Sequence, residues 1–181
     1  MKIFIGGSRA VSRLSAVIRD RLDDVMKKGC TVLIGDANGA DKAVQQYFAD
    51  RHYQNVVVFC MENCRNNMGQ WPTRGVEPPP GSTGFSYYSA KDLVMSQEAG
   101  CGLMLWDGKS KGTLQNMLRL VGAGKPTLVY FAPMKEFYRL SGDADLQALF
   151  ALCRKDDLDL AARGLGLRHP LTQTHLPLAP V

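Results

Sequence analysis

Glycine, hydroxyl and basic side chains gather between Asp107 and Thr113, where the chain reads Asp-Gly-Lys-Ser-Lys-Gly-Thr. Gly108 and Gly112 allow the backbone to approach a ligand closely, and Ser110 and Thr113 supply hydroxyl donors. A helix that begins here offers unpaired N–H groups and positive partial charge to an anion. Because two lysines add further positive charge, the segment favours a phosphate ligand.

A similar turn follows the first apolar run of the chain. Gly6 and Gly7 end that run, and Ser8 and Arg9 follow them directly. Ser8 is a suitable helix cap, and the guanidinium of Arg9 can hold a phosphate through two parallel hydrogen bonds. This turn therefore offers a second set of groups for an anion.

A third turn carries carboxylates instead of cations. Gly35 and Asp36 follow the second apolar run, and Gly39 and Asp41 lead into a helical pattern. Carboxylates repel phosphate, but they accept hydrogen bonds from ribose hydroxyls or from the amino group of a base. Asp41 therefore either contacts the sugar or base of a nucleotide or simply stabilises the start of its helix.

Apolar runs alternate with segments of helical periodicity along the first 133 residues, which predicts a doubly wound, mostly parallel sheet of five strands. In such a sheet, the turns at the carboxyl ends of the strands lie along one edge, so the glycine turns can meet at one ligand. The predicted strands span residues 2–5, 30–34, 56–60, 102–105 and 127–131.

Two parts of the chain depart from this alternation. Residues 61–86 have no periodicity, which suggests a lid over the site, a partner surface with Trp71 as its anchor, or a decorative insertion. Residues 134–181 are expected to form a helical appendage and an irregular tail within the same globule, next to a nucleotide-binding domain of residues 1–133. The short helices expected in the appendage span residues 134–138, 145–153 and 156–162.

Composition narrows the class of protein. The 181 residues carry a formal net charge of +5, which supports a phosphate or nucleic-acid partner only weakly because the basic residues are scattered. No apolar run approaches the length of a membrane span, and the first residues lack a signal-peptide pattern, so we expect a cytoplasmic protein without a membrane partner.

The residues that commonly bind metal ions are not spaced for a metal site. Cys60 and Cys64 are too far apart for a Cys-x-x-Cys pair and have no second pair nearby. His52, His169 and His175 are isolated from one another. We therefore expect no metal and no cofactor.

The motifs together resemble the SLOG superfamily, which unites the DNA-processing protein A type, the Lonely Guy type of nucleotide phosphoribohydrolases and small YspA/YpsA-related proteins. The similarity covers about the first three-quarters of the chain and is greatest to the YspA branch, because of the Trp-Asp-Gly-Lys-Ser-x-Gly-Thr sequence. The segments that carry it are Gly6–Arg9, Gly35–Asp41, Lys91–Met95 and Trp106–Thr113.

The resemblance implies a Rossmann-like fold in which the Gly112-Thr113 turn holds a phosphate and the turn before Asp41 lines the nucleotide. In the Lonely Guy enzymes, an arginine and a glutamate serve cleavage of the N-glycosidic bond. The matching positions here hold Lys91 and Asn116. Lys91 lacks the planar fork of arginine, and Asn116 cannot act as a carboxylate, so this mechanism is not expected.

Three functions remain open. The first is a nucleotide-binding or sensing protein without turnover. The second is a nucleotide N-glycosidase that uses another carboxylate, with Asp36, Asp41, Asp107 and Lys91 as the catalytic candidates. The third is single-stranded DNA binding, which is less favoured because the sequence shows no evident aromatic platform. Many members of the superfamily are dimers, so a homodimer is also expected.

Overall fold

A seven-stranded sheet forms the centre of the computed structural model, which describes residues 1–167. All neighbouring strands are parallel except the last pair, which is antiparallel. Across the sheet, the strands are β4 (Thr73–Gly75), β3 (Val56–Cys60), β2 (Thr31–Gly35), β1 (Lys2–Gly7), β5 (Cys101–Trp106), β6 (Thr127–Phe131) and β7 (Glu136–Leu140).

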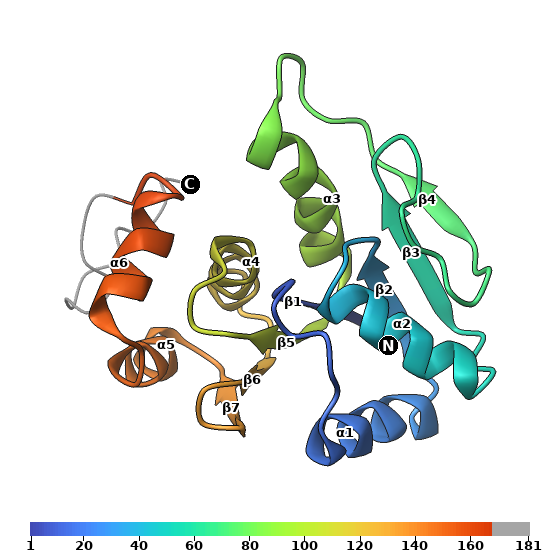
Figure 1. The fold of residues 1–181 in the computed structure, drawn as a ribbon, viewed down its shortest axis with the longest axis horizontal. Coiled ribbons are helices and arrows are strands. Elements are labelled where there is room, and N and C mark those ends of the chain that lie inside the picture. Colours follow the sequence, from blue (N-terminus) through green and yellow to red (C-terminus); the bar gives the residue numbers. More distant parts are fainter. Residues whose placement is uncertain (168–181) are drawn as a thin grey trace.

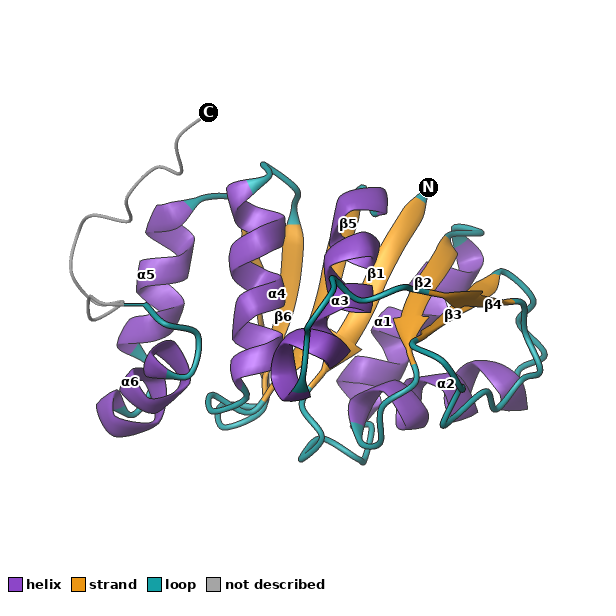
Figure 2. Ribbon diagram, turned by 90° about the horizontal axis from the view of Figure 1, so that it is seen from above, coloured by secondary structure: helices purple, strands orange, loops and turns teal. Residues whose placement is uncertain are grey.

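Helices cover both faces of the sheet, so the fold has three layers (Figure 1). Each face has its own apolar core, because the strands bury side chains on both sides. One face is covered by α1 (Ala16–Lys27) and α2 (Ala40–Asp50), and the other by α3 (Gly84–Glu98) and α4 (Lys111–Gly122), followed by α5 (Asp143–Ala151) and α6 (Lys155–Arg163) (Figures 1 and 2).

The direction of strand addition reverses at β1. From β1 the chain builds outward to β2, β3 and β4 on one side, and then returns to place β5, β6 and β7 on the other side. At such a switch point, the connections leave the carboxyl ends of β1 and β5 in opposite directions, which opens a crevice between them. The fold thus brings the turns after these two strands together.

The five predicted strands are present as β1, β2, β3, β5 and β6, but the predicted strand number is wrong because β4 and β7 extend the sheet. The helix predicted for residues 134–138 is also wrong. Lys135 has a φ of 57° and lies in a turn that reverses the chain into β7. There, Phe137 packs against Tyr130 and Tyr138 packs against Phe131, which is the alternation of a strand.

The aperiodic segment between β3 and α3 contributes to the sheet. It contains β4, whose short strand pairs with β3. Trp71 is only 4% exposed and its indole N–H donates to the carbonyl of Tyr53, so its predicted role as a surface anchor is wrong. Cys60 and Cys64 form a disulfide at the start of the segment.

Beyond the sheet, the helices expected near residues 145–153 and 156–162 correspond to α5 and α6. The irregular tail expected from Arg168, with His169 and His175, lies outside the described residues. No helix in residues 1–167 is long and apolar enough to cross a membrane. The division of the chain at residue 133 stays a prediction.

Candidate functional site

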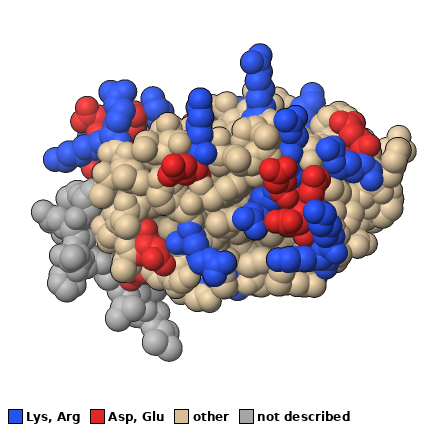
Figure 3. All heavy atoms as spheres, turned by 90° about the horizontal axis from the view of Figure 1, so that it is seen from below, with Lys and Arg blue, Asp and Glu red and all other residues tan. Residues whose placement is uncertain are grey.

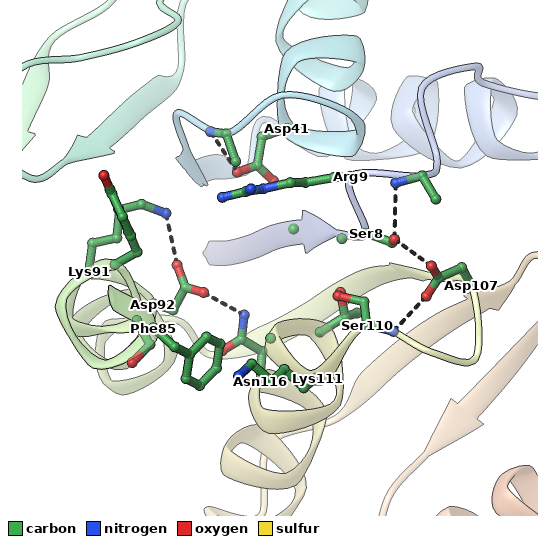
Figure 4. A pocket seen from close by; sticks show the side chains of 18 of the residues that line it. Ser8, Arg9, Asp41, Phe85, Lys91, Asp92, Asp107, Ser110, Lys111 and Asn116 are labelled. Atoms are coloured by element: carbon green, nitrogen blue, oxygen red, sulfur yellow. Dashed lines mark hydrogen bonds and ion pairs between the residues drawn. The ribbon is translucent and has the colours of Figure 1, made fainter. Parts of the chain in front are cut away.

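A pocket of about 550 Å³ opens at the switch point between β1 and β5. Its walls come from the turns after β1, β2 and β5 and from the first turns of α3 and α4 (Figure 4). The structure therefore brings together most of the residues singled out from the sequence. Those that line the pocket are Gly6, Gly7, Ser8, Arg9, Asp41, Lys91, Asp107, Ser110, Gly112 and Thr113.

Four of the singled-out residues lie outside the pocket lining and support it from behind. Gly35 and Asp36 end β2 and begin its turn, and Gly39 precedes α2. Gly108 has a φ of 79°, so it provides the left-handed residue of the turn after β5. Their contribution is to shape the turns.

The first turn of α4 presents free backbone donors to the pocket. Within residues 1–167, the N–H groups of Lys111, Gly112 and Thr113 have no hydrogen-bond acceptor. The Thr113 hydroxyl donates to the Ser110 hydroxyl over 3.2 Å, which keeps both side chains at the start of the helix. A helix N-terminus of this kind is suited to an anion.

Asp107 organises the turn that leads to these donors. One carboxylate oxygen accepts from the N–H groups of Lys109 and Ser110 at 3.1 and 2.8 Å. The other accepts from the Ser8 hydroxyl at 2.8 Å, which joins the turns after β1 and β5 (Figure 4). Because both oxygens are occupied, Asp107 holds the turn in place and is a poor candidate for a catalytic base.

Lys91 is a buried cation at the opposite side of the pocket. It is 4% exposed, and its Nζ lies 3.0 Å from Asp92 Oδ1 and 3.9 Å from Asp36 Oδ1. Burial alone lowers the pKa of Lys91, but the carboxylates of Asp92, Asp41 and Asp36 outweigh it and raise this pKa above its usual value. Lys91 is therefore protonated at neutral pH.

Asp36 is held by Arg65, a residue within the aperiodic segment. The backbone N–H and Nε of Arg65 donate to Oδ2 at 3.1 Å, and its Nη2 donates to Oδ1 at 2.7 Å. Burial opposes ionisation of Asp36, but these hydrogen bonds lower its pKa overall. Asp36 is thus an ionised structural partner at neutral pH, and no spacing in the sequence pointed to Arg65.

Asp41 has the most perturbed carboxylate in the pocket. It is 7% exposed, and burial raises its pKa to about 6 despite the opposing charge of Lys91. Oδ2 accepts from the N–H of Ala37 at 3.2 Å, and Oδ1 lies on the side of Gly6, where a Cβ atom would be 3.9 Å away. Asp41 therefore offers the pocket a group that is close to titration at neutral pH.

The side of the pocket that holds Asn116 still contains a carboxylate, that of Asp92. Its Nδ2 donates to Oδ2 of Asp92 over 3.0 Å, and both residues line the pocket. Asp92 thus joins Lys91 and Asn116 into one hydrogen-bonded row (Figure 4). Sequence reasoning did not select Asp92, because its partner is 24 residues away on another helix.

Aromatic side chains of α3 also line the pocket, although the sequence showed no evident aromatic platform. Lys111 Nζ lies 4.3 Å from the centre of the Phe85 ring. The guanidinium carbon of Arg65 lies 5.0 Å from the centre of the Tyr88 ring, which is 45% exposed. These pairs give the rim both π faces and positive charge.

Arg9 adds an exposed cation at the mouth of the pocket. Figure 4 shows its side chain reaching over the end of β1 toward the turn that carries Asp41. Its backbone is fixed by Gly39, which has a φ of 85° and where a Cβ atom would lie 2.3 Å from the Arg9 Cα. Only glycine permits this approach, which brings the turns after β1 and β2 together.

The fold is similar to that of a protein that handles DNA. DNA processing protein A from Helicobacter pylori, whose structure was described with its single-stranded DNA binding mode, shares 15% identity with this chain at a TM-score of 0.56. The similarity covers 93% of this chain and 82% of that one. No family model matches this sequence, and no curated protein matches it. The likeness therefore shows the Rossmann-like α/β fold that the sequence predicted.

Proposed function

We propose that the pocket binds a nucleotide or nucleotide-derived ligand, with a phosphate at the first turn of α4. The observation that carries this proposal is the set of free N–H groups at Lys111, Gly112 and Thr113, which open into a pocket at the switch point of the sheet. Phosphate is the anion that such a helix start commonly holds in folds of this kind.

The other walls complement the rest of a nucleotide. Lys111 supplies positive charge beside the helix start, and Arg9 supplies it at the side of the pocket where Asp41 lies. Asp41 and Asp92 lie toward the other side, where their oxygens can accept hydrogen bonds from sugar hydroxyls or from an amino group of a base. The pocket therefore separates a phosphate end from a polar, acidic end.

Binding without turnover is the favoured role. Asp107 and Asp36 are occupied by structural hydrogen bonds, and Asn116 stands where the resemblance places a catalytic glutamate. We accordingly propose a sensor or binding protein of the SLOG superfamily. Its place in the YspA-related branch and its expected homodimer and cytoplasmic location stay predictions.

Calorimetric titration with nucleoside mono- and diphosphates tests the binding proposal. Arg9→Gln is expected to weaken binding about tenfold, because it removes a positive charge from the pocket that attracts the anionic ligand. Arg13→Gln is the matched control, since Arg13 is an exposed residue of the same connection that does not line the pocket. Absence of binding by any nucleotide, or equal loss in both variants, contradicts the proposal.

Nucleotide N-glycosidase activity is the second candidate, and it is favoured by the carboxylate of Asp41 in the same pocket, whose pKa burial raises to about 6. Free base is measured after incubation with nucleoside monophosphates, NAD and ADP-ribose. Many equivalents of base per protein, lost in Asp41→Asn, support an enzyme. Release below one equivalent supports the binding role.

Single-stranded DNA binding is the third candidate, and the aromatic pairs formed by Phe85 and Tyr88 favour it. On the face shown in Figure 3, however, basic side chains are interspersed with acidic ones and form no continuous band. If this candidate is correct, the protein binds a single-stranded oligonucleotide with an affinity that falls as the salt concentration rises. The affinity also falls when Tyr88 is replaced by alanine.

A further inference from the structure

A second cavity, of about 450 Å³, adjoins the pocket at the first turns of α3. Phe85 and Ser89 line both hollows, so the two share a wall. The other walls come from the segment before α3, from α3 itself, from α4 and from the residues just after α6, and they include Val76, Leu93 and Leu165. We call this second hollow the α3–α4 cavity.

Two polar groups of α4 line the α3–α4 cavity without full use of their hydrogen-bonding capacity. Gln115 Oε1 is buried and has no partner within residues 1–167. Arg119 is partly buried, forms no ion pair in that range, and donates only to Asn116 Oδ1 over a long 3.5 Å. A buried acceptor without a donor is costly, so this cavity is chemically incomplete when empty.

The phosphate-binding turn lies at the boundary between the pocket and the cavity. Lys111, Gln115 and Arg119 are four residues apart and share one face of α4, with a rise of about 6 Å from each to the next. At Gly112, a Cβ atom would lie 3.7 Å from the Phe85 ring, which separates the two hollows. The turn therefore contacts the aromatic wall that the pocket and the cavity share.

We propose that the α3–α4 cavity binds the second group of a ligand that carries organic groups on both sides of its phosphate. This proposal rests on the proposed nucleotide-binding function and narrows its ligand from a nucleoside monophosphate to a dinucleotide, joined through a phosphodiester or a pyrophosphate. The first nucleoside occupies the pocket, and the second occupies the cavity.

The lining of the cavity suits a nucleobase. A base has a planar apolar surface, which matches the walls formed by Val76, Leu93 and Phe85. Its edge carries a donor beside an acceptor, as in adenine or cytosine. The acceptor receives a hydrogen bond from the Arg119 guanidinium, and the donor pairs with Gln115 Oε1 once this buried side chain rotates toward the base. A simple aliphatic group would leave both polar groups unpaired.

Titration calorimetry with matched ligands tests the proposal. The ligands are adenosine monophosphate, a dinucleoside phosphodiester and a dinucleoside pyrophosphate, and the variants are Gln115→Leu and Arg119→Gln. Arg139→Gln is the control, because Arg139 is an exposed residue of β7 that lines neither hollow. Thermal unfolding of each variant verifies that its fold is intact.

At least one dinucleotide is expected to bind about tenfold or more tightly than the monophosphate, a difference typical of satisfying one buried charged hydrogen bond. Each cavity variant should abolish this advantage and leave monophosphate binding unchanged. Equal affinity for all ligands, or an advantage that survives both variants, overturns this proposal while the nucleotide site stands. Absence of binding by every ligand overturns both.

Discussion

Replacing Asp41 with asparagine gives a quantitative test of how the pocket is charged. Asp41 is 7% exposed, and burial raises its pKa from the usual 3.8 to about 6. The folded protein therefore holds the Asp41 proton more tightly than the unfolded chain does. Ionised Asp41 lowers the stability of the fold, and this penalty develops as pH rises from about 4 to about 6.

A shift of about two pKa units corresponds to about 3 kcal/mol, since each unit is worth about 1.4 kcal/mol. Asp41→Asn removes the titration. The difference in unfolding free energy, variant minus wild type, is thus expected to increase by about 3 kcal/mol between pH 3.5 and pH 7. The attraction between Lys91 and ionised Asp41 is already contained in this pKa, and Lys91 itself stays protonated across the range because its pKa lies above its usual value of 10.5.

Urea denaturation of both proteins at intervals across this pH range measures the difference. Groups distant from Asp41 titrate equally in both proteins and cancel. Asp50→Asn, at the exposed end of the same helix α2, serves as the control variant. A difference for Asp41→Asn that is flat with pH, or that falls as pH rises, would refute the assignment of a raised pKa.

Further predictions concern the groups that shape the pocket. Arg65→Gln removes the arginine that pairs with buried Asp36 and should lower the unfolding free energy by about 2 kcal/mol. Arg74→Gln, which breaks an exposed pair with Glu98, should lower it by less than about 1 kcal/mol. Equal losses of unfolding free energy in urea denaturation would contradict this prediction. Gly39→Ala must place a Cβ atom 2.3 Å from Arg9 and should destabilise by more than about 2 kcal/mol, whereas Gly29→Ala, with a similar positive φ and open space, should cost about 1 kcal/mol. In the wild-type protein, Asp92 accepts a hydrogen bond from the Asn116 amide at 3.0 Å. Asn116→Asp places a second carboxylate there, so the stability of the variant relative to wild type should fall as pH rises from 4 to 7. A pH-independent cost would show that the two side chains separate in the variant.

The sheet could be predicted from sequence where burial on both faces left a signal. β5, for example, buries every residue after Cys101, so its apolar run marks it as a central strand. β4 has three exposed residues and no such run. β7 lies at an edge, and its alternation of aromatic residues was too short to distinguish from a helical turn.

The site could be predicted only where its residues are close together in the sequence. The turn at Gly112 and Thr113 was visible because its residues are consecutive. The pairs of Asp36 with Arg65 and of Asp92 with Asn116 join residues 29 and 24 positions apart, so no local pattern reveals them. Gly39 was predicted to lie against a ligand, whereas in the structure it lies outside the pocket lining and against the Arg9 backbone.

The central claim is that the first turn of α4 holds the phosphate of a nucleotide. Nuclear magnetic resonance of the ¹⁵N-labelled protein tests it directly during titration with adenosine monophosphate and with inorganic phosphate. The amide signals of Lys111, Gly112 and Thr113 are expected to shift and saturate with both ligands, while those at the start of α5 stay in place. Unchanged signals at these three amides under saturating nucleotide would contradict the claim.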